Sequence, residues 1–348
     1  MEMAVSVPEA FRRQAGWCAD LGSPFTARLL TLAAADLDGG GPLAALVGDW
    51  PGDPVADALA LRVAGALHAL VLSGKAPRLA ACYPPAGDGT GGDLWPSALA
   101  ALAAHASFVR AMLASPPQTN EVRRSGILLG GYLAVARAWG LPLRVLEIGA
   151  SAGLNLAFDR YAYRLGEAAW GPAGAGVAIP VEWRGPLPDL AAPLEVAERA
   201  GCDRQPIDLG DPDARLRLRA YVWADQRDRL ARLEGAIAEA LAAGLAVERA
   251  DAADWVERRL AEPAPGRATV LAHSIVWQYL PSATQGRIAA AAARRGAGAT
   301  PVSPFAWLRF EPAGEDGFAL ILSLWPGPLD RRLALAHPHG AWVQWLEA

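Results

Sequence analysis

The segment Val145–Asn155, which reads VLEIGASAGLN, has the residue types and spacing of a turn that holds a nucleotide-like cofactor. Its apolar start predicts a buried parallel strand, and Gly149 follows where the chain turns sharply. Gly153 stands where a helix opens and where a side chain would block the close approach of a ligand. The first turn of a helix offers such a ligand free backbone N–H groups and the positive end of the dipole. The residues expected to bind the cofactor here are Glu147, Gly149, Ser151, Gly153 and Asn155.

The spacing of this turn narrows the kind of cofactor. The pattern E-x-G-x-S-x-G differs from the dinucleotide pattern G-x-G-x-x-G, which disfavours NAD and FAD. No Gly-Lys-Ser/Thr follows the glycines, which disfavours a P-loop. The alternative is a tight turn whose glycines serve packing alone. A glutamate within a buried strand needs a polar partner, and this favours a ligand-binding turn over one that serves packing alone.

The turn resembles motif I of class I S-adenosylmethionine-dependent methyltransferases, in which the acidic residue and the glycines contact the methionine part of the cofactor. The whole chain is also similar to a bacterial family known as a domain of unknown function (DUF2332). The similarity rests on QTNEVRRS at 118–125, EIGASAGLNLAFDRYAY at 147–163, GCDRQPIDLGDP at 201–212, YVWADQ at 221–226 and AHSIVWQYLP at 272–281. The resemblance implies a methyltransferase-like fold with a helical N-terminal extension, and S-adenosylmethionine as the cofactor.

By the same resemblance, an acidic residue at the end of the second strand binds the ribose hydroxyls, since one carboxylate accepts from both. Asp203 is favoured over Asp225 and Glu167 by its context in GCDRQP. Asp251, or Asp254, matches the acidic position near the adenine, where Trp255 could stack on the ring. The alternative for these two aspartates is a helix N-cap.

The segment AHSIVWQYLP occupies the position of the fourth strand, where the resemblance places the methyl acceptor. His273 and Tyr279 are the candidate catalytic residues and Gln278 a candidate substrate-binding residue. The alternative is that His273 is a core residue whose ring is hydrogen-bonded within the protein and takes no part in catalysis. The segment lacks the D/N-P-P-Y signature, which argues against amino groups of bases or glutamine as acceptors.

The segment QTNEVRRS supplies three further candidates for substrate binding, Asn120, Glu121 and Arg124, as a lid over the pocket. Arg124 could clamp a carboxylate or a phosphate. The alternative is that Thr119 or Asn120 caps a helix and that Glu121 complements its dipole.

A mixed α/β fold is expected to position these residues. Residues 1–140 show apolar residues at helical spacing, broken by Pro and Gly, and predict an all-helical region. Residues 141–348 alternate strands with helices and predict a Rossmann-like methyltransferase fold, mostly parallel, with a C-terminal antiparallel hairpin. Alternating residues near 160–190 predict an inserted antiparallel hairpin, and residues 211–243 predict one helix capped by Asp211.

Composition bounds the function. Hydrophobic residues make up 53 % of the 348-residue chain and the formal net charge is −4, which suits a globular protein without an electrostatic footprint for nucleic acid. Three scattered cysteines and five histidines show no spacing for a metal or for a disulfide framework. Without a signal peptide or an apolar run long enough to span a bilayer, a cytoplasmic protein that contacts no membrane is expected.

The sequence therefore predicts methyl transfer from S-adenosylmethionine to a small-molecule acceptor, without a metal. It carries no signal for an oligomeric state. Two alternatives stay open: a cofactor-binding regulator or pseudo-enzyme, and a nicotinamide-dependent oxidoreductase.

Overall fold

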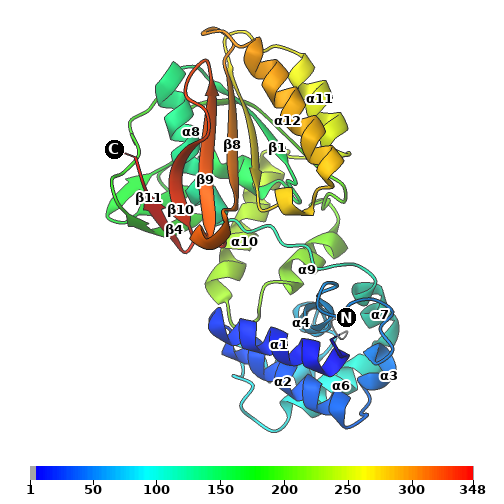
Figure 1. Cartoon of the computed structure of the whole chain (residues 1–348). Helices are drawn as coiled ribbons and strands as arrows, with labels where there is room; N and C mark the ends of the chain where they lie inside the picture. Colours follow the sequence, from blue (N-terminus) through cyan, green and yellow to red (C-terminus); the bar gives the residue numbers. More distant parts are fainter. Residues whose placement is uncertain (1–4, 348) are drawn as a thin grey trace. The chain divides into compact units, whose positions relative to one another are not determined.

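The computed structural model describes residues 5–347 and divides into two compact units (Figure 1). One comprises the described residues up to Thr119 and the segment Asp211–Ala231. The other comprises Asn120–Gly210 and the chain from Arg232 onward. The structure therefore divides the chain at other places than residue 140: residues 120–140 belong with the sheet, and residues 211–231 with the helices.

The first unit is helical, as predicted. Its helices are α1 (Val7–Asp20), α2 (Pro24–Asp38), α3 (Ala44–Val47), α4 (Leu59–Leu72), α5 (Pro77–Ala80), α6 (Leu94–Ala104), α7 (Ala106–Leu113) and α9 (Pro212–Ala220). Their apolar faces share one core. Residues 94–113 are divided between α6 and α7, because the backbone of His105 leaves the helical conformation. Among the described residues no single helix has the length and apolarity of a membrane span; α6 and α7 reach them only as a pair bent by 92°.

Residues 211–231 join this unit through specific contacts. Asp211 caps α9, as predicted, and accepts from the backbone N–H of Asp213 at 2.9 Å. The predicted helix 211–243 is interrupted after α9 and resumes as α10 (Arg227–Ala242). In the interruption Asp225 accepts from Ser23 Oγ at 2.5 Å and from Phe25 N at 2.9 Å, so it caps α2 from across the sequence.

The second unit contains an eleven-stranded sheet in the order β3-β2-β4-β11-β10-β9-β8-β7-β1-β5-β6. Its strands are β1 (Leu143–Ile148), β2 (Ala162–Leu165), β3 (Ala168–Trp170), β4 (Ala178–Arg184), β5 (Val196–Asp203), β6 (Val247–Arg249), β7 (Ala268–Ser274), β8 (Phe305–Pro312), β9 (Phe318–Trp325), β10 (Arg331–Ala336) and β11 (Trp342–Trp345). Neighbouring strands from β6 to β8 all pair in parallel, and β8 pairs antiparallel with β9. A mixed α/β fold with the predicted C-terminal hairpin is thus confirmed, and β10 and β11 extend it.

The predicted hairpin near 160–190 is wrong in its pairing. The two alternating segments, β2 and β4, pair in parallel, and the antiparallel partner of β2 is the short strand β3. The chain reverses at Gly166, whose φ of +59° suits a tight turn, and then returns to the other edge of β2. Because β4 also pairs with β11, the insertion extends the main sheet.

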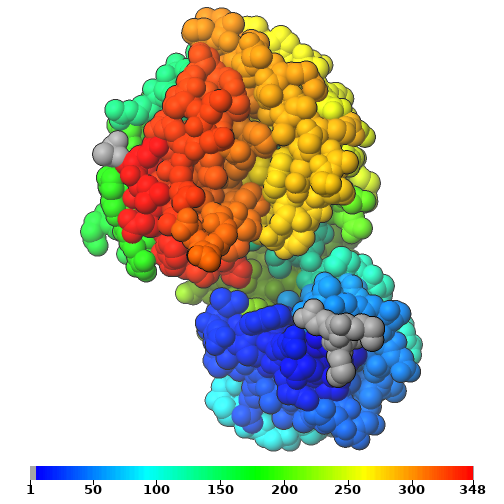
Figure 2. Space-filling view, viewed as in Figure 1, coloured from blue at the N-terminus to red at the C-terminus, as the bar shows by residue number. Residues whose placement is uncertain are grey.

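Helices cover both faces of the sheet. Helix α8 (Arg124–Trp139) lies on the face of Leu308, whose side chain fills the space that a Cβ on Gly131 would need. The preceding residue of β8, Trp307, points to the opposite face and packs with α11 (Ala252–Ala261) and α12 (Ser282–Ala297). Figures 1 and 2 show α12 beside β8 and β9 on this face.

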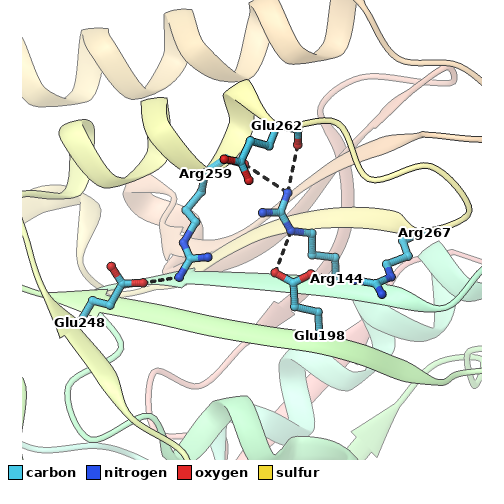
Figure 3. A network of polar contacts seen from close by, with 6 residues as sticks. All are labelled: Arg144, Glu198, Glu248, Arg259, Glu262 and Arg267. Carbon is cyan, nitrogen blue, oxygen red and sulfur yellow. Dashed lines mark hydrogen bonds and ion pairs between the residues drawn. The ribbon is translucent and has the colours of Figure 1, made fainter.

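An ion-pair network anchors the amino-terminal end of β1 (Figure 3). The Arg144 side chain is 5 % exposed, and its Nε donates to Glu198 at 3.0 Å. Its Nη1 donates to the carbonyl oxygens of Arg259 at 3.1 Å and Glu262 at 3.2 Å. Glu198 also accepts from Arg267, which is 44 % exposed. Glu198 thus neutralises one buried and one exposed cation.

Replacing Glu198 with alanine is expected to lower the free energy of unfolding by about 2–3 kcal/mol, because the buried Arg144 loses its counter-charge. Arg267→Ala removes the other ion pair of the same carboxylate and should cost less than about 1 kcal/mol. Urea denaturation of both variants measures the difference. If both variants lost the same free energy of unfolding, the burial of Arg144 would not be the reason for the effect of Glu198→Ala.

Candidate functional site

The order of the parallel strands defines a crevice. Numbered along the chain, the five strands β1, β5, β6, β7 and β8 stand in the order 3-2-1-4-5, which reverses between β1 and β7. Ligands of doubly wound sheets bind at this reversal, outside the carboxyl ends of the strands. The turn after β1 and the loop after β7 both lie there, and the Val276 side chain fills the space beside Gly149. The predicted cofactor turn therefore occupies the crevice.

The backbone of the turn is left-handed at alternate residues, with φ of +67° at Gly149, +55° at Ser151 and +75° at Gly153. A Cβ on Gly149 would meet Val276 at 2.5 Å, and one on Gly153 would meet Val247 at 3.0 Å. Backbone conformation and packing alone therefore account for both glycines. Ser151 adopts the same conformation with a side chain, at a cost that such residues carry mainly at functional sites.

The helix expected after Gly153 is a 3-10 helix, η1 (Leu154–Arg160), and not a longer α-helix. The Leu154 N–H is already bonded at 3.1 Å, to the side-chain oxygen of Asn120. Arg199 holds the far end of η1 on β5 through Asp159, with N–O distances of 2.6 and 2.9 Å. The segment after Gly153 is thus a short 3-10 helix, and the Leu154 N–H at its start is not free for a ligand.

Three polar side chains at this turn are buried with an unsatisfied atom. Glu147 is 3 %, Ser151 6 % and Asn155 3 % exposed. Glu147 Oε2, Ser151 Oγ and Asn155 Oδ1 have no hydrogen-bond partner within residues 5–347. A buried polar atom without a partner costs about 1–3 kcal/mol, so three at one turn indicate a missing ligand.

Burial, opposed by the charge of Arg124 and reinforced by that of Asp203, raises the pKa of Glu147 from 4.5 to about 8. The carboxyl group is therefore protonated at neutral pH in the ligand-free protein. A cation placed against Oε2 would favour the ionised form.

Asp203 ends β5, the strand next to β1, as predicted for the ribose-binding residue. Its Oδ2 accepts from Ser151 N at 3.0 Å and its Oδ1 from Gln205 N at 2.9 Å. Asp203 thus braces the cofactor turn directly. The two competitors lie elsewhere: Glu167 is exposed in the β2–β3 turn, and Asp225 caps α2 in the helical unit.

Asp251 is the N-cap of α11, accepting from Ala253 N at 2.9 Å and Asp254 N at 3.3 Å. Asp254 pairs with Arg287 at 2.7 Å. Trp255 is fully buried in the core under Arg259, so it does not offer a ring face to adenine. At Asp251 the structure therefore agrees with the alternative of a helix N-cap.

His273 is the penultimate residue of β7 and is 1 % exposed. Its Nδ1 lies 2.6 Å from Oε1 of Glu311, and its ring stacks on Trp277 with centroids 5.1 Å apart. Tyr279 is 72 % exposed in the short 3-10 helix η2 (Trp277–Tyr279), and Gln278 is exposed beside it. The structure therefore places His273 in a buried polar pair and leaves Tyr279 and Gln278 at the surface, apart from it.

The substrate-binding candidates of residues 118–125 lie in the sheet unit. The predicted N-cap at Thr119 or Asn120 is wrong, because α8 begins only at Arg124. Asn120 instead bonds the cofactor turn, and Glu121 is buried and accepts from Arg123 N at 3.2 Å. Arg124 donates to the Pro338 carbonyl at 2.9 Å and acts electrostatically on Glu147.

Glu311 is the residue that the sequence analysis missed. It follows Trp307 and Arg309 on one face of β8, beside β7. In the sequence, Glu311 could be noticed only as a carboxylate at the end of a nearly apolar strand. Its pairing with His273 depends on the register of β7 with β8, which the sequence does not specify. Within residues 5–347 no group of three or more His, Cys, Asp and Glu could hold a metal ion.

The structure is a mixed α/β protein whose candidate ligand site lies at the strand reversal. Residues 8–345 match the family described as an uncharacterized protein conserved in bacteria (DUF2332), and the chain belongs to this family. Searches of curated proteins and of solved structures gave no match.

Proposed function

We propose that the turn between β1 and η1 binds S-adenosylmethionine in a Rossmann-like, methyltransferase-type sheet, and that the protein methylates a small acceptor. The observation that carries this proposal is the set of three unsatisfied buried atoms on Glu147, Ser151 and Asn155. A protonated amino group donates three hydrogen bonds, and oxygen atoms of these three side chains are available acceptors.

The residues of the crevice fit the parts of this cofactor. Glu147, Ser151 and Asn155 would hold the amino-acid end, and Asp203 has carboxylate lone pairs for the ribose hydroxyls. The cofactor supplies an electrophilic methyl group on a sulfonium ion. The protein contributes alignment of the acceptor and exclusion of water, for which the buried turn and the adjoining Val276 loop are suited.

Calorimetric titration with S-adenosylmethionine, S-adenosylhomocysteine and NAD tests the proposal. The first two should bind and NAD should not. Because the amino group ionises the protonated Glu147, about one proton should be released per ligand at pH 7. Repeating the titration in phosphate and Tris, whose ionisation enthalpies differ, measures that number. A folded protein that gives no heat with either adenosyl ligand would refute the proposed cofactor.

One observation favours the alternative of a binding protein without methyl transfer: the His273 side chain has 0 % exposure. A regulator would bind the cofactor with the same proton release. It would form no S-adenosylhomocysteine with any acceptor, which chromatography of the reaction mixture detects.

A further inference from the structure

Glu311 fixes the orientation of the His273 ring. Its Oε1 lies 2.6 Å from His273 Nδ1 and accepts from Val276 N at 3.1 Å and from Trp277 N at 3.3 Å. Because this oxygen already accepts two backbone N–H groups, the contact favours a proton on Nδ1. A ring protonated at Nδ1 alone carries its lone pair at Nε2.

The remaining nitrogen of this ring is unused. Nε2 of His273 has no hydrogen-bond partner in the described part of the chain, and neither has Oε2 of Glu311. A histidine whose purpose was to fasten the loop after β7 would need only its Nδ1 contact. A buried, oriented lone pair is the arrangement that removes a proton from a bound molecule.

The pair stands beside the cofactor turn. Val276, three residues after His273, packs on Gly149. The loop after β7 and the turn after β1 therefore touch in the crevice. Glu147 pairs in register with Ala272, and His273 therefore leaves the sheet on the other face. His273 and Glu147 therefore lie on opposite faces of the sheet, near the ends of the neighbouring strands β7 and β1.

The cover over His273 is held under strain. The Trp277 ring lies on the imidazole with an interplanar angle of 13°. Two residues before it, Ile275 has a φ of +52°, a left-handed conformation that β-branched residues rarely adopt.

We propose that Glu311 is a positioning residue that holds His273 as the general base for a hydroxyl acceptor. The inference rests on the proposed methyl transfer and names its substrate class. The acceptor oxygen bonds to the methyl group as the sulfur–methyl bond breaks, the sulfur keeps the electron pair, and the hydroxyl proton moves to His273 Nε2. A carboxylate acceptor would need no base, whereas a hydroxyl is protonated at neutral pH.

The first test reads the tautomer and needs no turnover. In the full chain labelled with ¹⁵N-histidine, long-range ¹H–¹⁵N spectra should show His273 protonated at Nδ1 only, with the signals assigned by their loss in His273→Asn. Glu311→Ala should give a mixture that includes the Nε2–H form, and Glu311→Gln should stay closer to the wild type. A wild-type spectrum with Nε2 protonated would overturn the proposal, whatever the cofactor result.

The second test separates positioning from structural support. With phenol, ethanol and ethanethiol as probes, S-adenosylhomocysteine should form fastest with a hydroxyl compound. Glu311→Ala should slow it by about 10²–10⁴-fold. The affinity for S-adenosylmethionine should stay within about threefold, and Glu315→Gln, an exposed carboxylate in the β8–β9 turn, should match the wild type.

An equal loss of affinity and rate in Glu311→Ala would assign Glu311 to structural support and overturn the positioning role. Cofactor binding without product from any of the three probes would overturn the hydroxyl assignment while the proposed cofactor site stands. Absence of cofactor binding in the wild type would instead refute the proposed function, and the tautomer spectrum would still decide the role of Glu311.

Discussion

Replacing Glu147 with glutamine is expected to stabilise the ligand-free protein at neutral and alkaline pH while weakening its affinity for S-adenosylmethionine. The reason is the buried carboxyl group, whose pKa rises from 4.5 to about 8 in the fold. Between these two values the unfolded chain is ionised and the folded chain is protonated. The folded protein binds more protons, so its stability falls as the pH rises through this window.

Glutamine has nearly the same shape and does not ionise, which removes this dependence. The stability of Glu147→Gln relative to the wild type should rise by about 3–4 kcal/mol between pH 5 and pH 8. Urea denaturation at several pH values gives this difference directly. Other groups that titrate in the same range, such as the buried His68 with its lowered pKa, contribute equally to both proteins and cancel.

Cofactor affinity should change in the opposite direction. A hydrogen bond to a charged group contributes about 1.5–3 kcal/mol, so the dissociation constant should rise about 10- to 100-fold. The proton release on binding should also disappear. Glu182→Gln, a carboxylate of β4 that is 63 % exposed, is the matched control and should change neither property. A variant less stable than the wild type at pH 8, or one with unchanged affinity, would contradict the role given to Glu147.

The cofactor turn could be predicted because its signal is local. Closely spaced glycines after an apolar run specify a sharp turn after a strand, and three of the predicted residues, Glu147, Ser151 and Asn155, carry the unsatisfied atoms. The hairpin of β8 and β9 is equally local, since two apolar runs are joined by a short Gly-containing connection. The 3-10 geometry of η1 could not be predicted, because it depends on Asn120 and Arg199, which are distant in sequence.

Long-range pairing explains the other errors. The side chains of β2 and β4 alternate in the same way whether the strands run parallel or antiparallel, and only the intervening β3 decides between them. Likewise, residues 211–231 look like any amphipathic helical segment. Tyr221 packs where a side chain on Gly65 would lie, and Asp225 caps α2, so their place is set by partners about 150 to 200 residues away.

Asp203→Ala is expected to raise the dissociation constant for S-adenosylmethionine by about 100-fold. This is at the upper end of the increase expected for Glu147→Gln. The substitution removes the acceptor of Ser151 N, which holds this residue at a φ of +55°, and the lone pairs proposed for the ribose. It also leaves Gln205 N without its acceptor. A loss of stability of about 1–3 kcal/mol should accompany it.

The control is Asp251→Ala, which removes an N-cap of α11 and should cost about 1 kcal/mol of stability with unchanged affinity. If Asp251→Ala weakened binding as much as Asp203→Ala, the nucleoside would lie against α11 instead, and the assignment to β5 would be wrong. Asp203→Asn keeps one acceptor oxygen and should fall between Asp203→Ala and the wild type.

Two fragments of the cofactor separate the roles of Asp203 and Glu147. Methylthioadenosine contains the ribose but lacks the amino-acid part with its α-amino group, so Asp203→Ala should weaken its binding and Glu147→Gln should leave it unchanged. S-adenosylhomocysteine contains both parts and should be weakened by each substitution. Because the two side chains act on opposite ends of the ligand, their effects on S-adenosylhomocysteine should add within about 0.5 kcal/mol in the double variant. A strongly non-additive result would mean that Asp203 acts mainly by holding the turn that carries Glu147, and not by contacting the ribose.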